Sequence, residues 1–289
     1  MAEPQLRLPS RIEDVVVVVH NDDIELFVLQ LRSFEIFLES CNLHIVINEE
    51  DTALCQAGVE SFLEVNVSKH RIKIWKRSDI ITISNDVPGW TSQQLLKLLI
   101  PLKYDWIVFD SKDILIRQTQ LIDLDKKQRK DYEDLSLKDP QGLFWQGLIE
   151  LGKEQGFPNI DPKLINENRT PRVIDNRVIR KLNQIFKSKE KFIDWFCSFS
   201  VPGEFILHDY LYEVLEIDSK MRFPLGYMHA VWRQHIFDEI DFVDILDTVH
   251  IYKCHSRVYN VKENRKKINK WIEKVFKTYI IYKEAIKGK

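Results

Sequence analysis

The chain has 289 residues and a formal net charge of -2, and 44% of its residues are hydrophobic while 30% are charged. These values fit a globular protein with a sizeable core, and the small net charge argues against a nucleic-acid-binding protein. The four cysteines are far apart in sequence, so we expect no zinc knuckle. No stretch approaches the about 18 apolar residues of a membrane span, so we expect no transmembrane segment and a cytoplasmic location.

In chain order, the first 113 residues alternate between apolar runs typical of strands and spacings typical of helices. They predict strand 14–20, helix 24–41, strand 43–48, helix 52–63, short strands 72–75 and 80–83, helix 90–102 and strand 105–110. β-Branched residues dominate the first strand, which is typical of a parallel strand buried on both faces. This alternation predicts an α/β fold with a mostly parallel central sheet flanked by helices.

Further helices are predicted near 176–196 and 204–215, and a C-terminal helical extension covers the last residues. This extension carries ten Lys or Arg against three Glu. We therefore expect a domain over 1–260 and a basic helix over 261–289. Two interpretations of the helix stay open: a peripheral contact with the anionic inner face of a membrane, or docking of its apolar side on the domain.

Acidic side chains follow two of the predicted strands. Asp22 and Asp23 follow the first strand, and Asp110 ends the strand at 105–110, with Asp113 three residues later. Ligands of parallel α/β sheets bind outside the carboxyl ends of the strands, so we expect these side chains at a binding site. Carboxylates there can hold a divalent ion that bridges two phosphates, and Lys112 can neutralise a diphosphate without metal.

The most specific stretch of the sequence is GWTSQQLLKLLIPLKYDWIVFDSKD, at 89–113. Its GW-x-x-QQ-x-x-K helix, followed by a hydrophobic strand ending in Asp, resembles a bacterial family of GT-A-type glycosyltransferases. The resemblance implies a GT-A-like (Rossmann-like) fold and a nucleotide-sugar donor. It also implies four donor-facing side chains on this helix: Trp90, Gln93, Gln94 and Lys97.

The resemblance gives roles to the acidic residues as well. In GT-A folds the loop after the first strand contacts the base and ribose, which implies donor binding by Asp22 and Asp23. Asp110 corresponds to the first acid of the family's D-x-D motif, whereas the second acid falls on Lys112. Either Asp113 is then the second ligand of Mn²⁺ or Mg²⁺, or Lys112 replaces the metal ion.

Later stretches complete the predicted site, although they match the family more faintly. Donor or phosphate contacts are implied for Arg172, Lys253 and Arg257, and a third metal ligand for His255. Glu204 follows Pro-Gly at a helix start, where it is a candidate acid or base for the acceptor or a simple capping residue. His208 lies one turn later, and together with Asp110 these two residues form the predicted catalytic set.

The function predicted from these residues is transfer of a sugar from a UDP-, GDP- or CMP-sugar to a glycan or a lipid-linked or capsular polysaccharide acceptor. Two alternatives stay open. One is a non-catalytic descendant of the fold that binds a nucleotide-sugar or glycan, and the other is a sugar nucleotidyltransferase. The sequence has no Gly-rich phosphate loop near the first strand, which disfavours the nucleotidyltransferase.

Overall fold

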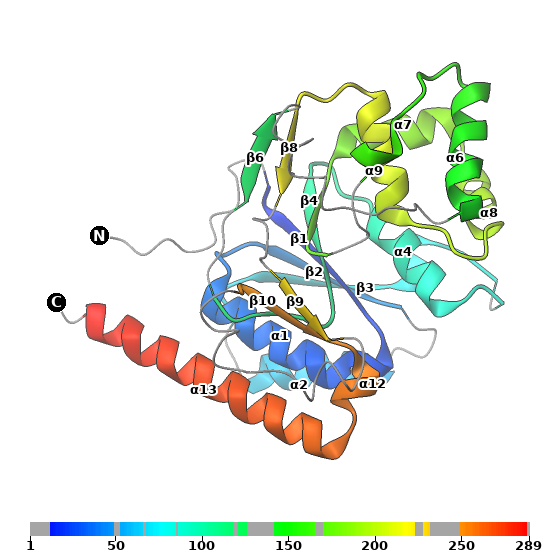
Figure 1. The fold of residues 1–289 in the computed structure, drawn as a ribbon. Helices are drawn as coiled ribbons and strands as arrows, with labels where there is room; N and C mark the ends of the chain where they lie inside the picture. Colours follow the sequence, from blue (N-terminus) through cyan, green and yellow to red (C-terminus); the bar gives the residue numbers. More distant parts are fainter. Residues whose placement is uncertain are drawn as a thin grey trace.

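Five strands form the central sheet of the computed structural model (Figure 1). They are β1 (Asp14–Val19), β2 (Asn42–Ile47), β3 (Arg71–Lys76), β4 (Trp106–Asp110) and β7 (Arg172–Ile174), in the order β3-β2-β1-β4-β7. The first four strands are parallel, and β7 is antiparallel to β4. The structure describes residues 12–48, 53–65, 68–84, 86–117, 121–125, 142–165, 170–222, 228–231 and 249–287.

The strand order contains one reversal of direction across the sheet. The chain moves outward from β1 to β2 and β3, and then crosses back to place β4 on the other side of β1. In the register, Val17 of β1 lies beside both Ile45 and Phe109. The predicted α/β fold with a mostly parallel sheet flanked by helices is therefore confirmed, and the reversal lies between β1 and β4.

Helices cover both faces of the sheet. One face is covered by α1 (Ile24–Phe37), α2 (Ala53–Val65) and α13 (Lys262–Lys287). The other face is covered by α4 (Gly89–Leu99), α6 (Gly142–Glu154), α7 (Asn176–Phe186), α8 (Lys189–Cys197) and α9 (Glu204–Val214). The short elements are α3 (Arg77–Ile80), α12 (Ser256–Tyr259), η1 (Asn21–Asp23) and η2 (Pro162–Leu164).

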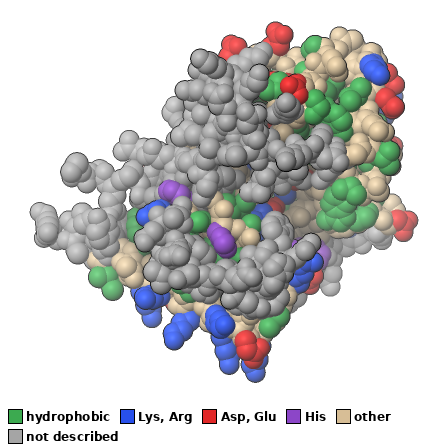
Figure 2. All heavy atoms as spheres, viewed as in Figure 1, with side chains coloured by type: hydrophobic (Ala, Val, Ile, Leu, Met, Phe, Trp, Pro, Cys, Tyr) green, Lys and Arg blue, Asp and Glu red, His purple; other side chains and the backbone are tan. Residues whose placement is uncertain are grey.

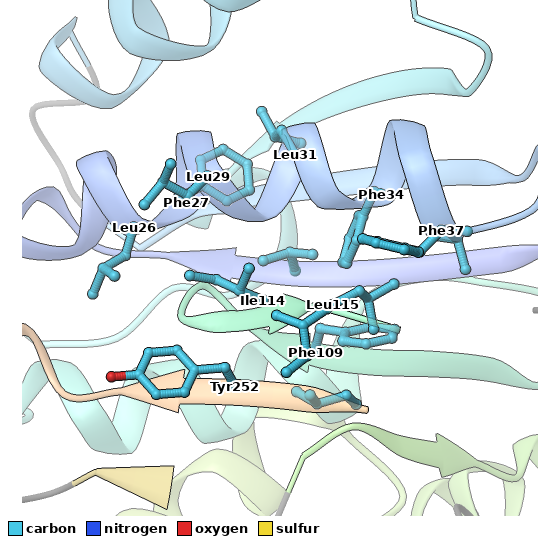
Figure 3. Packing of buried hydrophobic residues seen from close by; sticks show 14 of the residues in the cluster. Leu26, Phe27, Leu29, Leu31, Phe34, Phe37, Phe109, Ile114, Leu115 and Tyr252 are labelled. Carbon is cyan, nitrogen blue, oxygen red and sulfur yellow. The ribbon is translucent and has the colours of Figure 1, made fainter. Parts of the chain in front are cut away.

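The valine run of β1 supplies both cores. Val15, Val17 and Val19 join the core under α1, whereas Val16 and Val18 join the core under α4 and α9. Successive side chains of a strand point to opposite faces, so a strand with helices on both sides must be apolar throughout. Figure 3 shows the α1 side, where the ring of Phe34 lies against that of Phe109 with 5.0 Å between their centroids.

Two predictions about local structure need correction. The predicted strand at 80–83 does not form, since α3 ends at Ile80 and residues 81–84 have no regular structure. The carboxylate of Asp79 accepts a hydrogen bond from the backbone N–H of Lys76, which favours a helical turn there. The helix predicted at 176–196 is two helices, because Lys187 adopts a left-handed conformation with φ 60° and ends α7.

A second, smaller sheet brings a distant part of the chain to the end of β4. It consists of β5 (Asp113–Leu115), β10 (Ile251–Cys254) and β9 (Met228–Val231), in the order β5-β10-β9. The pairing of β10 with β5 is antiparallel and sets Lys253 opposite Asp113. A separate two-stranded sheet pairs β6 (Ile122–Asp125) with β8 (Ser219–Arg222).

The C-terminal helix α13 docks on α1. Trp271, Ile272 and Phe276 of its apolar stripe are buried, whereas Ile280 and Ile281 are 43% and 66% exposed. An ion pair between Arg32 of α1 and Glu273 adds to this contact. Lys and Arg side chains gather over α13 along the lower edge of the face drawn in Figure 2. Trp271, Ile272 and Phe276 of the stripe therefore belong to the core, as docking of this helix on the domain requires.

Isoleucine-to-alanine changes on this helix give a direct test of docking. Ile272→Ala is expected to lower the free energy of unfolding by about 2–5 kcal/mol, because it leaves a cavity in the core. Ile281→Ala removes the same atoms from an exposed position and is expected to cost less than about 0.5 kcal/mol. Urea denaturation of both variants measures the difference, and equal effects would contradict the docked arrangement.

Within the described residues, no helix has the length and apolar character that crossing a membrane requires.

Candidate active site

A pocket of about 280 Å³ lies at the carboxyl ends of the parallel strands. The residues that follow β1 contribute His20, Asp22 and Asp23, and Lys112 follows β4. The first turns of α4 add Trp90 and Gln93, while Asn48 and Ser256 also line the pocket. It therefore lies at the reversal of strand order between β1 and β4, which is where open α/β sheets bind their ligands.

Asp23 is the most unusual side chain of this pocket, because it is buried and only half satisfied. It is 4% exposed, and its Oδ2 accepts from the Ser111 hydroxyl at 2.8 Å and from the Lys112 ammonium at 3.1 Å. Its other oxygen, Oδ1, is buried without a hydrogen-bond partner. A buried carboxylate oxygen without a donor is costly, so it is a position where a ligand donor would be stabilised.

Trp90 and Gln93 line the pocket from α4. Trp90 is 40% exposed, and the amide of Gln93 donates to the carbonyl oxygen of Val18 at 3.4 Å. The start of α4 is fixed by Asn48, which donates to the Gly89 carbonyl oxygen at 2.7 Å. The exposed indole is therefore presented by an anchored helix terminus, a suitable arrangement for stacking on a planar or sugar ring.

Behind the pocket lies a buried cluster of charges that begins with Lys97 of α4. Its ammonium is 2.7 Å from Asp110 Oδ1 and 3.0 Å from Glu204 Oε1. With its amide turned to satisfy both neighbours, Gln94 donates to the Pro202 carbonyl oxygen at 2.7 Å and to Glu204 Oε2 at 3.1 Å. Lys97, Gln94 and Glu204 thus lie together, but in the interior rather than at the pocket wall.

Lys253 of β10 is the second cation of this cluster. Its ammonium pairs with Asp110 Oδ2, lies 3.2 Å from Asp113 Oδ1 and donates to the Thr170 hydroxyl at 2.9 Å. The other oxygen of Asp113 accepts from the backbone N–H of Asp110 at 2.8 Å. The two carboxylates at the end of β4 are therefore bridged by a lysine of this chain.

Burial and charge act in opposite directions on the ionisation of this cluster. Burial alone would raise the pKa of Asp110, but Lys253, Lys97 and Lys112 together lower it well below its usual range. Burial would lower the pKa of Lys97, yet Asp110 and Glu204 raise it. Burial raises the pKa of Asp113, against the opposing effect of Lys253. Asp110 and both lysines are therefore charged at neutral pH.

The predicted metal ligands are not brought together. The described part of the chain contains no group of three or more His, Cys, Asp or Glu side chains that could hold a metal ion. His255 instead caps α12, where its Nδ1 accepts from the backbone N–H of Arg257 at 3.2 Å. The structure therefore gives no support to a metal site formed by Asp110, Asp113 and His255, and Lys253 lies between the two carboxylates.

His255 and Arg257 still lie near the pocket. Burial lowers the pKa of His255, and the positive charges of Lys112, Arg257 and Lys253 lower it further, while Asp23 opposes them. His255 is therefore neutral at neutral pH and surrounded by cations. Lys112 pairs with Asp23, and Lys253 pairs with Asp110 and Asp113, so acids balance the charges of these two lysines.

Arg172 and His208, by contrast, are buried away from the residues that line the pocket. The guanidinium of Arg172 pairs with Asp209, which is fully buried. His208 accepts from the backbone N–H of Asp175 at 3.0 Å and is 1% exposed. Neither lines the pocket, so the structure gives no support to their predicted roles in donor binding and catalysis.

Several residues of the site were not identified from the sequence. Asn48 and Ser111 follow the ends of β2 and β4, so the strand-end argument that selected Asp23 would also have selected them. Gln30 of α1 gave no such signal. Its amide donates to the carbonyl oxygens of Asp110 and Asp113 at 2.6 and 2.9 Å, and so holds the chain between them.

No protein-family model and no curated protein matches the sequence. Among solved structures, the chain is similar to mouse xyloside xylosyltransferase 1, at 10% identity and a TM-score of 0.39 over 84% of this chain and 97% of that one. It is also similar to the galactosyltransferase LgtC with donor and acceptor sugar analogues, at 9% identity and a TM-score of 0.42 over 92% and 95%. A third similar structure is the mannosyltransferase Ktr4p from S. cerevisiae in complex with GDP. Its sequence identity is 12% and the TM-score is 0.43, over 73% of this chain and 71% of that one. These values are too low to assign a function.

Proposed function

We propose that this chain is a glycosyltransferase that binds a nucleotide-sugar in the pocket at the ends of β1, β2 and β4. The observation that carries the proposal is a pocket at the reversal of strand order that is lined by Asp23, a residue with one buried oxygen that has no hydrogen-bond partner. A ribose hydroxyl or a base N–H supplies the donor that this oxygen lacks. The sugar is then transferred to a glycan or lipid-linked acceptor.

The other pocket residues fit the remaining parts of such a donor. The exposed face of Trp90 offers a stacking surface for the base or the sugar ring. Lys112 lines the pocket, and Arg257 follows the pocket residue Ser256 in the chain. These two cations provide positive charge for the diphosphate. The volume of about 280 Å³ is just below the about 300–1,000 Å³ typical of ligand sites, which suits the nucleoside part of the donor alone.

The reaction forms a bond between the acceptor hydroxyl oxygen and the anomeric carbon of the sugar. The bond from that carbon to the diphosphate oxygen breaks, and the nucleoside diphosphate leaves with the bonding electrons. The acceptor proton passes to a base, and the cations beside the pocket stabilise the charge of the leaving group. Glu204 is held by Lys97 and Gln94, so we assign it to positioning Lys97 and leave proton transfer to a group nearer the pocket.

Nucleotide binding tests the proposal directly. A ligand at 100 times its Kd stabilises the folded state by about 2.7 kcal/mol. For a chain of this size we therefore expect one of UDP, GDP or CMP to raise the melting temperature by about 5–10 °C. Inorganic pyrophosphate is the control, because it lacks the groups that Asp23 and Trp90 would contact. Absence of a shift with every nucleotide would overturn the proposal.

A binding protein without transfer is the second candidate. It is favoured by the pairing of Asp110 and Glu204 with lysines, which leaves these two acids without a free oxygen for proton transfer. Release of nucleoside diphosphate from a panel of nucleotide-sugars separates the candidates. Release above the uncatalysed rate supports the transferase, and tight nucleotide binding without release supports the binding protein.

A further inference from the structure

The place between Asp110 and Asp113 is where a divalent metal would be expected in a site of this kind. Hard cations such as Mg²⁺ and Mn²⁺ prefer carboxylate oxygens, and two carboxylates at a strand end beside a diphosphate would supply them. In this chain the ammonium of Lys253 lies there, 3.2 Å from Asp113 Oδ1 and paired with Asp110 Oδ2. The position is therefore already filled by a cation.

The ammonium is matched to its surroundings. A lysine has three N–H donors and no acceptor. Lys253 faces three acceptors, namely the carboxylates of Asp110 and Asp113 and the hydroxyl of Thr170 at 2.9 Å. Its side chain is 4% exposed, so the charge is solvated by these groups rather than by water. A metal ion at the same place would have to displace a fully coordinated ammonium into the interior.

Backbone pairing, rather than a flexible stem, sets the position of this lysine. Lys253 lies in β10, directly opposite Asp113 of β5 in the antiparallel register. The flanking residues Tyr252 and Cys254 are fully buried, which fixes the strand on both sides. On the other side of Asp110, Lys97 is held at 2.7 Å by α4. Both oxygens of Asp110 are therefore committed to cations on rigid elements.

We infer that donor binding by this chain is independent of divalent metal, because Lys253 takes the place of the metal ion between Asp110 and Asp113. The inference rests on the proposed function for the identity of the donor. The role of the metal as counter-charge to the diphosphate then falls to side chains at the pocket, with Lys112 held in place by Asp23. This assignment keeps Lys112 as a counter-charge, as in the sequence-based alternative, and adds that Lys253 occupies the position between the two carboxylates.

Two measurements on the wild-type chain test the inference. Titration of Mn²⁺ followed by electron paramagnetic resonance is expected to show no stoichiometric site, with or without nucleotide. The Kd of the nucleotide that stabilises the chain is expected to agree within about twofold in EDTA and in excess Mn²⁺, an energy difference of about 0.4 kcal/mol or less. One Mn²⁺ per chain, or a Kd that rises tenfold or more in EDTA, would overturn the inference.

These outcomes are distinguishable from failure of the proposed function. If no nucleotide binds under either condition, the proposed function fails, and the Mn²⁺ titration without nucleotide still decides whether the position accepts a metal. If a nucleotide binds only with Mn²⁺, the proposed function stands and this inference fails.

Lys253→Ala gives an independent test, because it vacates the place between the two carboxylates. The folded variant is expected to gain a Mn²⁺ site that the wild type lacks, with Lys270→Met, a change of an exposed lysine on α13, as the control without gain. A folded variant that binds no Mn²⁺ would contradict the role given to Lys253. Should the variant fail to fold, the wild-type titration decides the question.

Discussion

Replacement of Lys97 by methionine is expected to lower the free energy of unfolding by about 3–5 kcal/mol, because it leaves the buried Glu204 carboxylate without its lysine and leaves Asp110 with Lys253 alone as an ion-pair partner. Lys97 is 5% exposed and lies between Asp110 and Glu204, so both carboxylates lose a cation. The exposed Lys270→Met is the matched control, with an expected effect below about 0.5 kcal/mol. Urea denaturation at neutral pH measures both.

A double variant shows whether the loss comes from the unpaired charge. Glu204→Gln removes the charge of one carboxylate while keeping its size, so Lys97→Met with Glu204→Gln is expected to be more stable than the sum of the single effects predicts. The coupling is expected to be about 0.5–3 kcal/mol, as found for residues in one network. Strict additivity would mean that Lys97 and Glu204 do not act as a pair.

Asp23→Asn is expected to weaken nucleotide binding by about 10- to 100-fold, the equivalent of one hydrogen bond to a charged acceptor. The substitution keeps the shape of the side chain but replaces one oxygen by an NH₂ group. If the remaining oxygen stays with Ser111 and Lys112, the NH₂ group meets the ligand donor in place of the unpartnered oxygen. Isothermal titration with the stabilising nucleotide measures the change.

The adjacent Asp22 provides the matched control. It lines the same pocket, but its side chain is 77% exposed and its charge is screened by water. Asp22→Asn is therefore expected to change the nucleotide Kd by less than about threefold. Equal losses in the two variants would indicate a general effect of charge and would remove the specific role of Asp23.

The sequence predicted the architecture better than the site. The apolar run of β1 indicated a strand covered on both faces, and the strand-end argument correctly placed Asp23 and Lys112 at one edge of the sheet. It could not separate Asp22 from Asp23, because adjacent acids have the same local pattern. Only the packing of Ser111 and Lys112 against Asp23 distinguishes the buried acid from the exposed one.

The sequence could not predict which buried acids and lysines pair with each other, because these pairs depend on tertiary packing. The pairing of Lys253 with Asp113 depends on the register of β10 with β5, and the place of Glu204 beside Lys97 depends on how α9 packs against α4. Neither arrangement leaves a periodic pattern in the chain. Arg172 and His208 do not line the pocket, and a motif match carries no information on which buried neighbours a polar residue contacts.

The long separations within the charge cluster have a consequence for biosynthesis. Lys97 and Glu204 are 107 residues apart in the chain, and Asp110 and Lys253 are 143 residues apart. A ribosome adds about 5–20 residues per second, so the carboxylate of Asp110 waits many seconds for its last counter-ion. During that interval Asp110 has Lys97 available as a partner but still lacks Lys253. Assembly of the charge cluster around Asp110 is therefore expected to finish only after β10 has emerged from the exit tunnel of the ribosome.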